Sequence, residues 1–119
     1  MRHSIATALR LASRRTNTEP SEEAKENDSY RKGVFDWHSL KIAVENPKGS
    51  ERSGVDKGGK RWSVTMPATY GEVRKSVGAD GDAVDAYIGS AHDSPTVWVV
   101  DQIDAKTGRF DEHKAFLSF

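Results

Sequence analysis

The chain has 119 residues, of which 35% are hydrophobic and 30% charged, so its length suits one small domain with one core. Eighteen basic side chains balance eighteen acidic ones, and this balance argues against a general nucleic-acid or membrane-surface binder, which carries a basic excess. The absence of cysteine excludes disulfides and thiolate metal sites and suits a reducing cytoplasm. No apolar run approaches the roughly 20 residues of a membrane span.

Residues 1–36 differ in composition from the rest, and we expect them to form an N-terminal arm that is partly helical or disordered. Residues 1–18 contain four arginines and no acidic residue. Four of their apolar residues fall on one helical stripe: Ile5, Ala8, Leu9 and Ala12. Organelle transit peptides have the same composition, so a targeting segment and an arm that docks on a partner are alternatives.

The first 18 residues of this arm and the segment that begins at Pro20 are expected to differ in structure. We expect residues 1–18 to lie outside the folded core, so that their removal would change stability little. Pro20 is suited to begin a short polar helix, in which Glu22 and Glu23 would lie at the positive end of the helix dipole.

From residue 37 onward the hydrophobic pattern has a period of two, which is typical of strands. The stretches that predict strands are 40–45, 62–66, 84–88, 96–103 and 110–119. Gly58 and Gly59 in "VDKGGKRW" predict a hairpin turn, and "DAKTGR" predicts another. About five short strands at regular spacing predict a mainly β fold, a small five-stranded OB-like antiparallel barrel over residues 37–119.

Three carboxylates are crowded into "GADGDAVDAYIG", at Asp80, Asp82 and Asp85. Strands avoid this density of acidic residues, because like charges repel unless a cation lies among them. Gly78 and Gly81 can bend the loop so that the carboxylates converge. Converging oxygen ligands favour Mg²⁺, with Mn²⁺ as the alternative, whereas a solvated acidic loop would hold no metal.

Further charged and polar residues lie at strand ends and in loops. Each of them alone is typical of a solvated surface group. Carboxylates for metals together with Arg, Lys and Tyr for phosphate oxygens are nevertheless the residue types of a phosphoryl-transfer site. The residues concerned are Glu45, Lys48, Arg52, Tyr70, Asp104, Asp111 and Lys114.

Several of these motifs occur in an order that resembles the soluble inorganic pyrophosphatase family. They are "ENPKGS", "MPATYGEV", "GADGDAVDAYIG" and "DAKTGRFDEHK". With "YRKG" and "VVDQIDAKTGRFDEHK", the chain is most similar to the compact pyrophosphatase-like domain of phage and mobile-element proteins. The resemblance covers about residues 30–119 and excludes the first 18 or so.

The resemblance implies an OB-like barrel whose mouth binds several Mg²⁺ ions and pyrophosphate. Asp82 would orient and deprotonate the attacking water. The implied metal ligands are Asp80, Asp85 and Asp111, with Asp104 and Glu45 holding further ions. The implied phosphate contacts are Arg52, Tyr70 and Lys114, together with Lys48 in the same loop as Arg52.

Some positions depart from the family pattern. Ala83 follows Asp82, where the family has other residues, and His113 stands where full-length enzymes carry the phosphate-binding lysine. Lys114 comes one residue later, so on an unbulged strand it would point away from Asp111. The Tyr-Lys pair that those enzymes place in a C-terminal helix has no counterpart among these residues.

Two functions therefore remain open. The first is Mg²⁺-dependent hydrolysis of pyrophosphate or a related phosphoanhydride in the cytoplasm of a bacterial host. The second is a catalytically inactive pyrophosphatase-like domain that a phage or mobile element uses to bind and inhibit a host defence complex. Neither reading predicts an oligomeric state.

Overall fold

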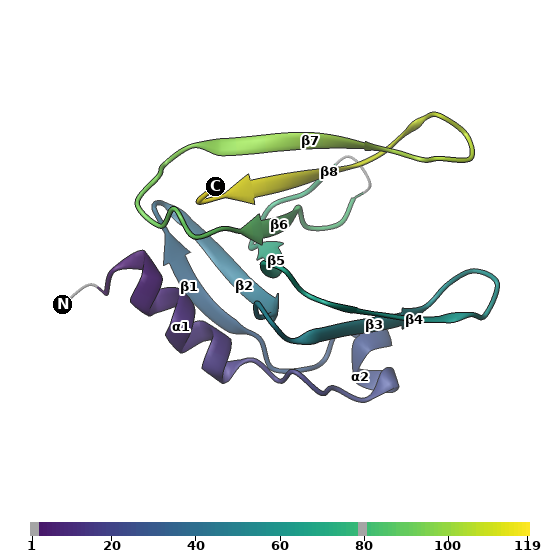
Figure 1. Cartoon of the computed structure of the whole chain (residues 1–119), viewed down its shortest axis with the longest axis horizontal. Helices are drawn as coiled ribbons and strands as arrows, with labels where there is room; N and C mark the ends of the chain where they lie inside the picture. Colours follow the sequence, from purple (N-terminus) through teal and green to yellow (C-terminus); the bar gives the residue numbers. More distant parts are fainter. Residues whose placement is uncertain (1–2, 79–80) are drawn as a thin grey trace.

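The computed structural model describes residues 3–78 and 81–119 and is mainly β, with helices near the N-terminus (Figure 1). The helices are α1 (Ile5–Arg15) and α2 (Glu22–Glu26). The strands are β1 (Gly33–Trp37), β2 (Leu40–Asn46), β3 (Glu51–Val55), β4 (Arg61–Thr65), β5 (Thr69–Val73), β6 (Asp85–Ile88), β7 (Val97–Ile103) and β8 (Phe110–Leu117). Neither described helix is long and apolar enough to span a bilayer.

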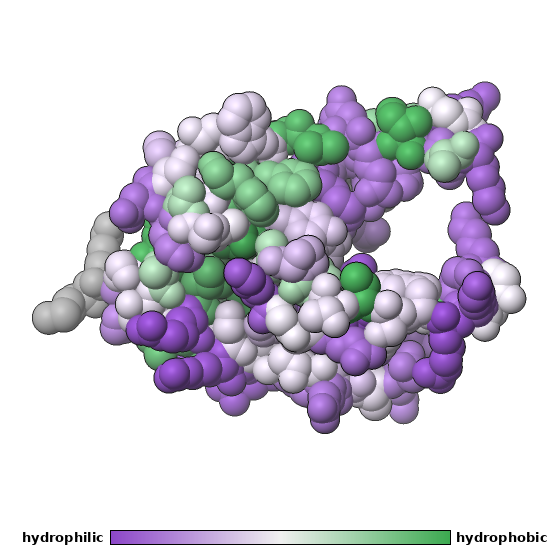
Figure 2. All heavy atoms as spheres, viewed as in Figure 1, coloured by the Kyte–Doolittle hydropathy of each residue, from purple (hydrophilic) through white to green (hydrophobic). Residues whose placement is uncertain are grey.

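The strands form an open sheet, so the prediction of a closed five-stranded barrel is wrong. Six strands pair in the order β1-β2-β5-β6-β8-β7, while β3 and β4 pair only with each other. β6 and β8 run parallel, so the sheet is not purely antiparallel either. The β3–β4 and β7–β8 hairpins project in the same direction with open space between them (Figures 1 and 2). Because β3 and β4 join neither edge of the sheet, they cannot close it into a barrel.

The sequence pattern predicted five of the eight described strands and missed β1, β3 and β5. The stretch 84–88 forms β6 with Ala86 and Ile88 buried and Asp85 on the opposite face, and both predicted hairpin turns are present. β1 begins within the predicted arm, and the predicted boundary after residue 36 falls inside this strand. β5 was also missed, because "TYGEV" is too short to show a clear alternation.

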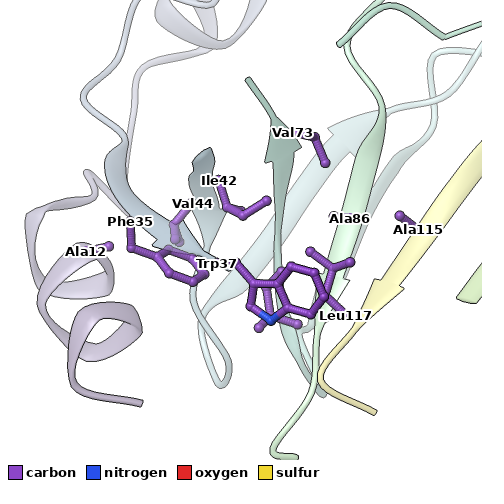
Figure 3. Close-up of a cluster of buried hydrophobic side chains, with 10 residues drawn as sticks. Ala12, Phe35, Trp37, Ile42, Val44, Val73, Ala86, Ala115 and Leu117 are labelled. Carbon is purple, nitrogen blue, oxygen red and sulfur yellow. The ribbon is translucent and has the colours of Figure 1, made fainter. Parts of the chain in front are cut away.

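The core lies on one face of the six-stranded sheet (Figure 3). Ile42, Val44 and Leu117 have no exposed surface, and burial of such a side chain contributes about 1.5–3 kcal/mol. The Trp37 indole N–H donates to the Ser118 hydroxyl at 2.8 Å, which satisfies a buried polar group. This bond joins β1 to the end of β8 and thus the first strand of the sheet to the last residues of the chain.

The helix α1 belongs to the core, so the prediction that residues 1–18 lie outside it is wrong. Ser4 caps its N-terminus, and Ala12 is only 1% exposed in the apolar cluster. The Thr16 hydroxyl accepts from the Gly33 N–H at 3.0 Å and lies 3.2 Å from the Val44 carbonyl. The predicted apolar stripe is real, and it packs against β1 because the small Ala12 lets the two backbones approach closely.

Gly33 tests this close approach. A Cβ added at Gly33 would lie 1.8 Å from the carbonyl oxygen of Ala12, so Gly33→Ala must push α1 away from β1. We expect the variant to lose about 3 kcal/mol of unfolding free energy, measured by urea denaturation. Gly58→Ala is the matched control, because its Cβ would meet nothing closer than 3.4 Å. Equal stability of the two variants would contradict the packing of α1 described above.

Candidate functional site

A row of charged residues crosses the sheet on the face opposite the core. Glu72 of β5 lies opposite Asp85 of β6, and Asp85 lies opposite Lys114 of β8. Tyr70 and Tyr87 form the next row, with their ring centroids 4.8 Å apart. The strand register therefore gathers polar side chains from separate sequence motifs on one surface.

Lys114 is the centre of this row. Its ammonium group lies 3.2 Å from the Tyr70 hydroxyl, 3.2 Å from the Asp85 carboxylate and 3.0 Å from the Glu112 carboxylate. Burial raises the pKa of Tyr70 above its ordinary value, and the hydrogen bond and charge of Asp85 raise it further. Burial lowers the pKa of Lys114, but its contacts with Glu112, Tyr70 and Asp85 outweigh this and raise it. At neutral pH the pair therefore offers a protonated hydroxyl and a cation.

Arg52 joins this group from the β3–β4 hairpin. Its guanidinium lies 4.7 Å from the Tyr70 ring centroid and 5.5 Å from that of Trp62, both within cation–π range. The structure thus brings Arg52, Tyr70 and Lys114 together at one place. Lys48 lies exposed in the β2–β3 loop, where its backbone N–H donates to the Thr69 hydroxyl at 3.1 Å.

A second ion cluster surrounds Lys32, which the sequence reasoning missed. The Lys32 side chain is only 7% exposed, and its ammonium group lies 2.5 Å from Asp28, 3.4 Å from Glu45 and 3.5 Å from Glu72. Burial raises the pKa of Glu45, Lys32 opposes this rise, and Glu72 and Asp85 add to it. Burial alone would lower the pKa of Lys32, but the three carboxylates raise it. Lys32 belongs to the "YRKG" motif, but nothing in the local sequence showed which carboxylates it would contact.

Glu45 and Arg52 also line a cleft of about 550 Å³ between the N-terminal segment and the β2–β3 region. Its lining mixes charges of both signs with hydroxyl groups. The described lining residues are Thr18, Glu19, Pro20, Lys25, Asp28, Tyr30, Glu45, Asn46, Ser50, Glu51, Arg52 and Ser53. The cleft therefore leads from the surface to the Lys32 cluster.

The aspartates of the last hairpin contact groups within that hairpin. Asp104 caps the β7–β8 turn, where its carboxylate accepts from the N–H groups of Lys106 at 2.7 Å and Thr107 at 3.2 Å. Asp111 accepts from the Gln102 amide at 3.1 Å. It is three residues along β8 from Lys114, which is roughly 10 Å at the usual strand rise. The register shifts between Gln102 and Ile103, so no residue of β7 lies directly opposite Asp111. β8 is therefore bulged here, and the assumption of an unbulged strand does not hold.

Asp82 lies in the exposed loop before β6, where its backbone carbonyl accepts from the Gly78 N–H at 2.7 Å. Asp80 lies outside the described residues, so the predicted convergence of Asp80, Asp82 and Asp85 stays a prediction. His113, which replaces the expected lysine, contacts Asp101 of β7 at 2.8 Å instead of joining Lys114.

Comparison with known proteins identifies the family. A family model of inorganic pyrophosphatases matches residues 22–119, which is most of the chain. The chain belongs to the inorganic pyrophosphatase family. Searches of the curated proteins and of the solved structures gave no match. The match confirms the resemblance seen in the motifs, and it excludes α1 although α1 packs into the core.

Inorganic pyrophosphatases generally use Mg²⁺, so the carboxylates of this member must be compared with the needs of that ion. Within residues 3–78 and 81–119, no three carboxylate or imidazole groups are placed to hold one metal ion. Asp85 is paired with Lys114, and Glu45 with Lys32. The described residues therefore do not fit a metal centre made by the protein alone. Mg²⁺ is commonly held by one or two carboxylates plus the phosphates of a substrate.

Removing Lys32 tests how much this pyrophosphatase domain depends on its buried charge cluster. Lys32→Met leaves Glu45 and Glu72 together without their cation, and we expect a loss of about 3 kcal/mol in unfolding free energy. The pKa of Glu45 should rise further, so the folded variant binds a proton that the unfolded chain releases. Its stability relative to wild type should then fall as pH increases above about 4.3, the ordinary value for Glu.

The control for this experiment is Lys41→Met. Lys41 and Asp36 form an exposed ion pair at 2.8 Å, with 64% and 71% of their side chains exposed. Its loss should change stability by less than about 1 kcal/mol. Thermal melting from pH 4 to 8 measures both variants. Similar losses in the two variants would show that the Lys32 cluster contributes no more than a surface pair.

Proposed function

We propose that this domain hydrolyses pyrophosphate or a related phosphoanhydride that is supplied as its Mg²⁺ complex. The observation that carries the proposal is the grouping of Arg52, Tyr70 and Lys114 beside Asp85 in a member of the inorganic pyrophosphatase family. Cationic and hydroxyl donors bind the phosphate oxygens of a metal–diphosphate complex, and a neighbouring carboxylate binds its metal ion.

The phosphate half of the proposed site uses the donors of the charged row. Lys114 stays cationic and Tyr70 stays protonated at neutral pH, because the pKa of each is raised. Arg52 adds a planar guanidinium that can contact two phosphate oxygens at once. Together the three donors would hold the diphosphate and offset the negative charge that develops on the leaving phosphate.

Asp82 is the proposed general base. It would accept a proton from a water molecule while the water oxygen bonds to one phosphorus and the bridging P–O bond breaks. The bridging oxygen leaves with the second phosphate, so each pyrophosphate and water yield two phosphates. Asp82 precedes β6 by three residues, in an exposed loop that leads directly to Asp85.

When bound with the substrate, Mg²⁺ would neutralise phosphate charge and lower the pKa of bound water. We propose Asp85 and Asp80 as the carboxylates that contact the complex, with Mn²⁺ as an alternative ion. Asp85 is already neutralised by Lys114. Binding of the complex would let Lys114 move its contact from Asp85 to a phosphate oxygen, because both are anionic acceptors.

A second candidate function is a pyrophosphatase-like domain without activity that a phage or mobile element uses to bind a host defence complex. The lysine pairing favours it, since Lys32 and Lys114 satisfy carboxylates that would otherwise attract metal. In that case the charged row is a stable structural feature and no diphosphate binds.

The Asp82→Asn variant tests the catalytic proposal. Wild type should release phosphate from pyrophosphate in Mg²⁺ and lose this activity in EDTA. The variant keeps the shape of the side chain but loses the proton acceptor, so its kcat should fall by about 10²–10⁴-fold. Its melting temperature should stay close to that of wild type. Asp93→Asn, on the exposed loop before β7, is the control and should keep full activity. A wild-type rate equal to the protein-free blank would favour the second function.

Ligand stabilisation tests binding apart from catalysis. A ligand that binds only the folded state raises the melting temperature. At a hundredfold excess over its Kd it adds about 2.7 kcal/mol to the free energy of unfolding. We expect Mg²⁺ together with a non-hydrolysable diphosphate analogue to raise the melting temperature by more than the sum of the two separate increases. Lys114→Met should abolish this gain. Equal melting curves in EDTA and in the mixture would contradict the proposed site even if the protein proved inactive.

A further inference from the structure

β7 is the outermost strand of the sheet, and its apolar side chains are exposed on both faces. The exposed fractions are 44% for Val97, 59% for Trp98, 62% for Val99 and 48% for Val100. Figure 2 shows hydrophobic side chains along the upper rim of the molecule, where β7 runs in Figure 1. Such an edge offers unpaired backbone N–H and C=O groups to a further strand.

The two outer strands of the sheet differ in their packing. On the β1 side, α1 packs against the strand, and the Thr16 hydroxyl bridges Gly33 of β1 and Val44 of β2. Among the described elements, only β8 packs extensively against β7. The stretch from Val97 to Val100 contains no lysine, proline or bulge, the features that usually prevent edge strands from pairing. The outer side of β7 is thus suited to pairing with a further strand.

The charges of β7 allow it to pair with a copy of itself. Its one charged residue is Asp101, which already contacts His113 at 2.8 Å. In a symmetric antiparallel pair centred on Val99, Asp101 would lie opposite Val97. Centred on Val100, it would lie opposite Val99. Neither arrangement places like charges opposite each other, which would be destabilising.

The ends of the strand are complementary as well. The loop before β7 carries the exposed Asp93, and the β7–β8 turn carries the exposed Lys106 and Arg109 with Asp104, a net charge of +1. Antiparallel pairing of two copies would bring the acidic end of each strand beside the basic turn of the other. This complementarity favours a second copy of the chain over an unrelated strand as the occupant of the edge.

We propose that β7 pairs antiparallel with β7 of a second copy, so that the two six-stranded sheets become one continuous sheet. The contact is isologous, because the same surface of each chain takes part. Because the pairing occupies β7 of both copies, this contact closes at the dimer. The inference is independent of the proposed hydrolysis.

The oligomeric state of the full chain tests this proposal. Wild type should sediment as a dimer in analytical ultracentrifugation. Val99→Lys combined with Val100→Lys should make it monomeric, because one of the two lysines meets its own counterpart at the symmetry axis in either register. The control combines Val55→Lys with Val77→Lys at sites that are 53% and 76% exposed, and it should remain dimeric. Circular dichroism confirms that each variant is folded.

A charge-swapped mixture makes the test specific for the β7–β7 contact. Val99→Glu combined with Val100→Glu should also be monomeric. An equimolar mixture of the two double variants should form a dimer, because opposite charges then meet at the axis. A wild type that stays monomeric up to about 1 mM would overturn the proposal. So would higher oligomers, a dimer of the double-lysine variant, or a mixture that stays monomeric.

Discussion

The alternation of side chains across β2, β5, β6 and β8 is the constraint on which the rest of the structure depends. Val44, Gly71, Ala86 and Ala115 lie opposite one another in consecutive strands and face the core. The neighbouring residues Glu72, Asp85 and Lys114 form the charged row on the other face. A slip of one residue would bury the charges and expose the core, so the apolar cluster also holds the candidate site in register.

The charged row is stable because lysines lie between its carboxylates. Lys32 forms ion pairs with carboxylates of the N-terminal segment, β2 and β5. Lys114 of β8 forms ion pairs with carboxylates of β6 and of β8 itself. Removing a partner from a buried ion cluster leaves an uncompensated charge, which is far more costly than losing an exposed pair. The same cations that stabilise the fold are suited to bind phosphate oxygens. Stability and the proposed chemistry therefore use the same side chains.

Local sequence patterns predicted the parts of the fold that depend on neighbouring residues. The alternation at 84–88 correctly placed Asp85 away from the core, and the glycines of "VDKGGKRW" correctly placed a hairpin. The pattern failed where a contact between distant segments decided the outcome. The apolar stripe of α1 was visible, but its docking depends on Gly33, about twenty residues later in the chain. Lys32 was missed for the same reason, since its partners reach from Asp28 to Glu72.

The sequence by itself determined the family, the mainly β character and the residue types of the site, because ordered motifs and two-residue periodicity are local properties of the chain. Only the tertiary structure decided that the sheet stays open and that α1 joins the core. It also decided that Arg52, Tyr70 and Lys114 meet beside Asp85. These outcomes depend on which strands pair and in which register, and that choice is made by contacts between segments far apart in the sequence.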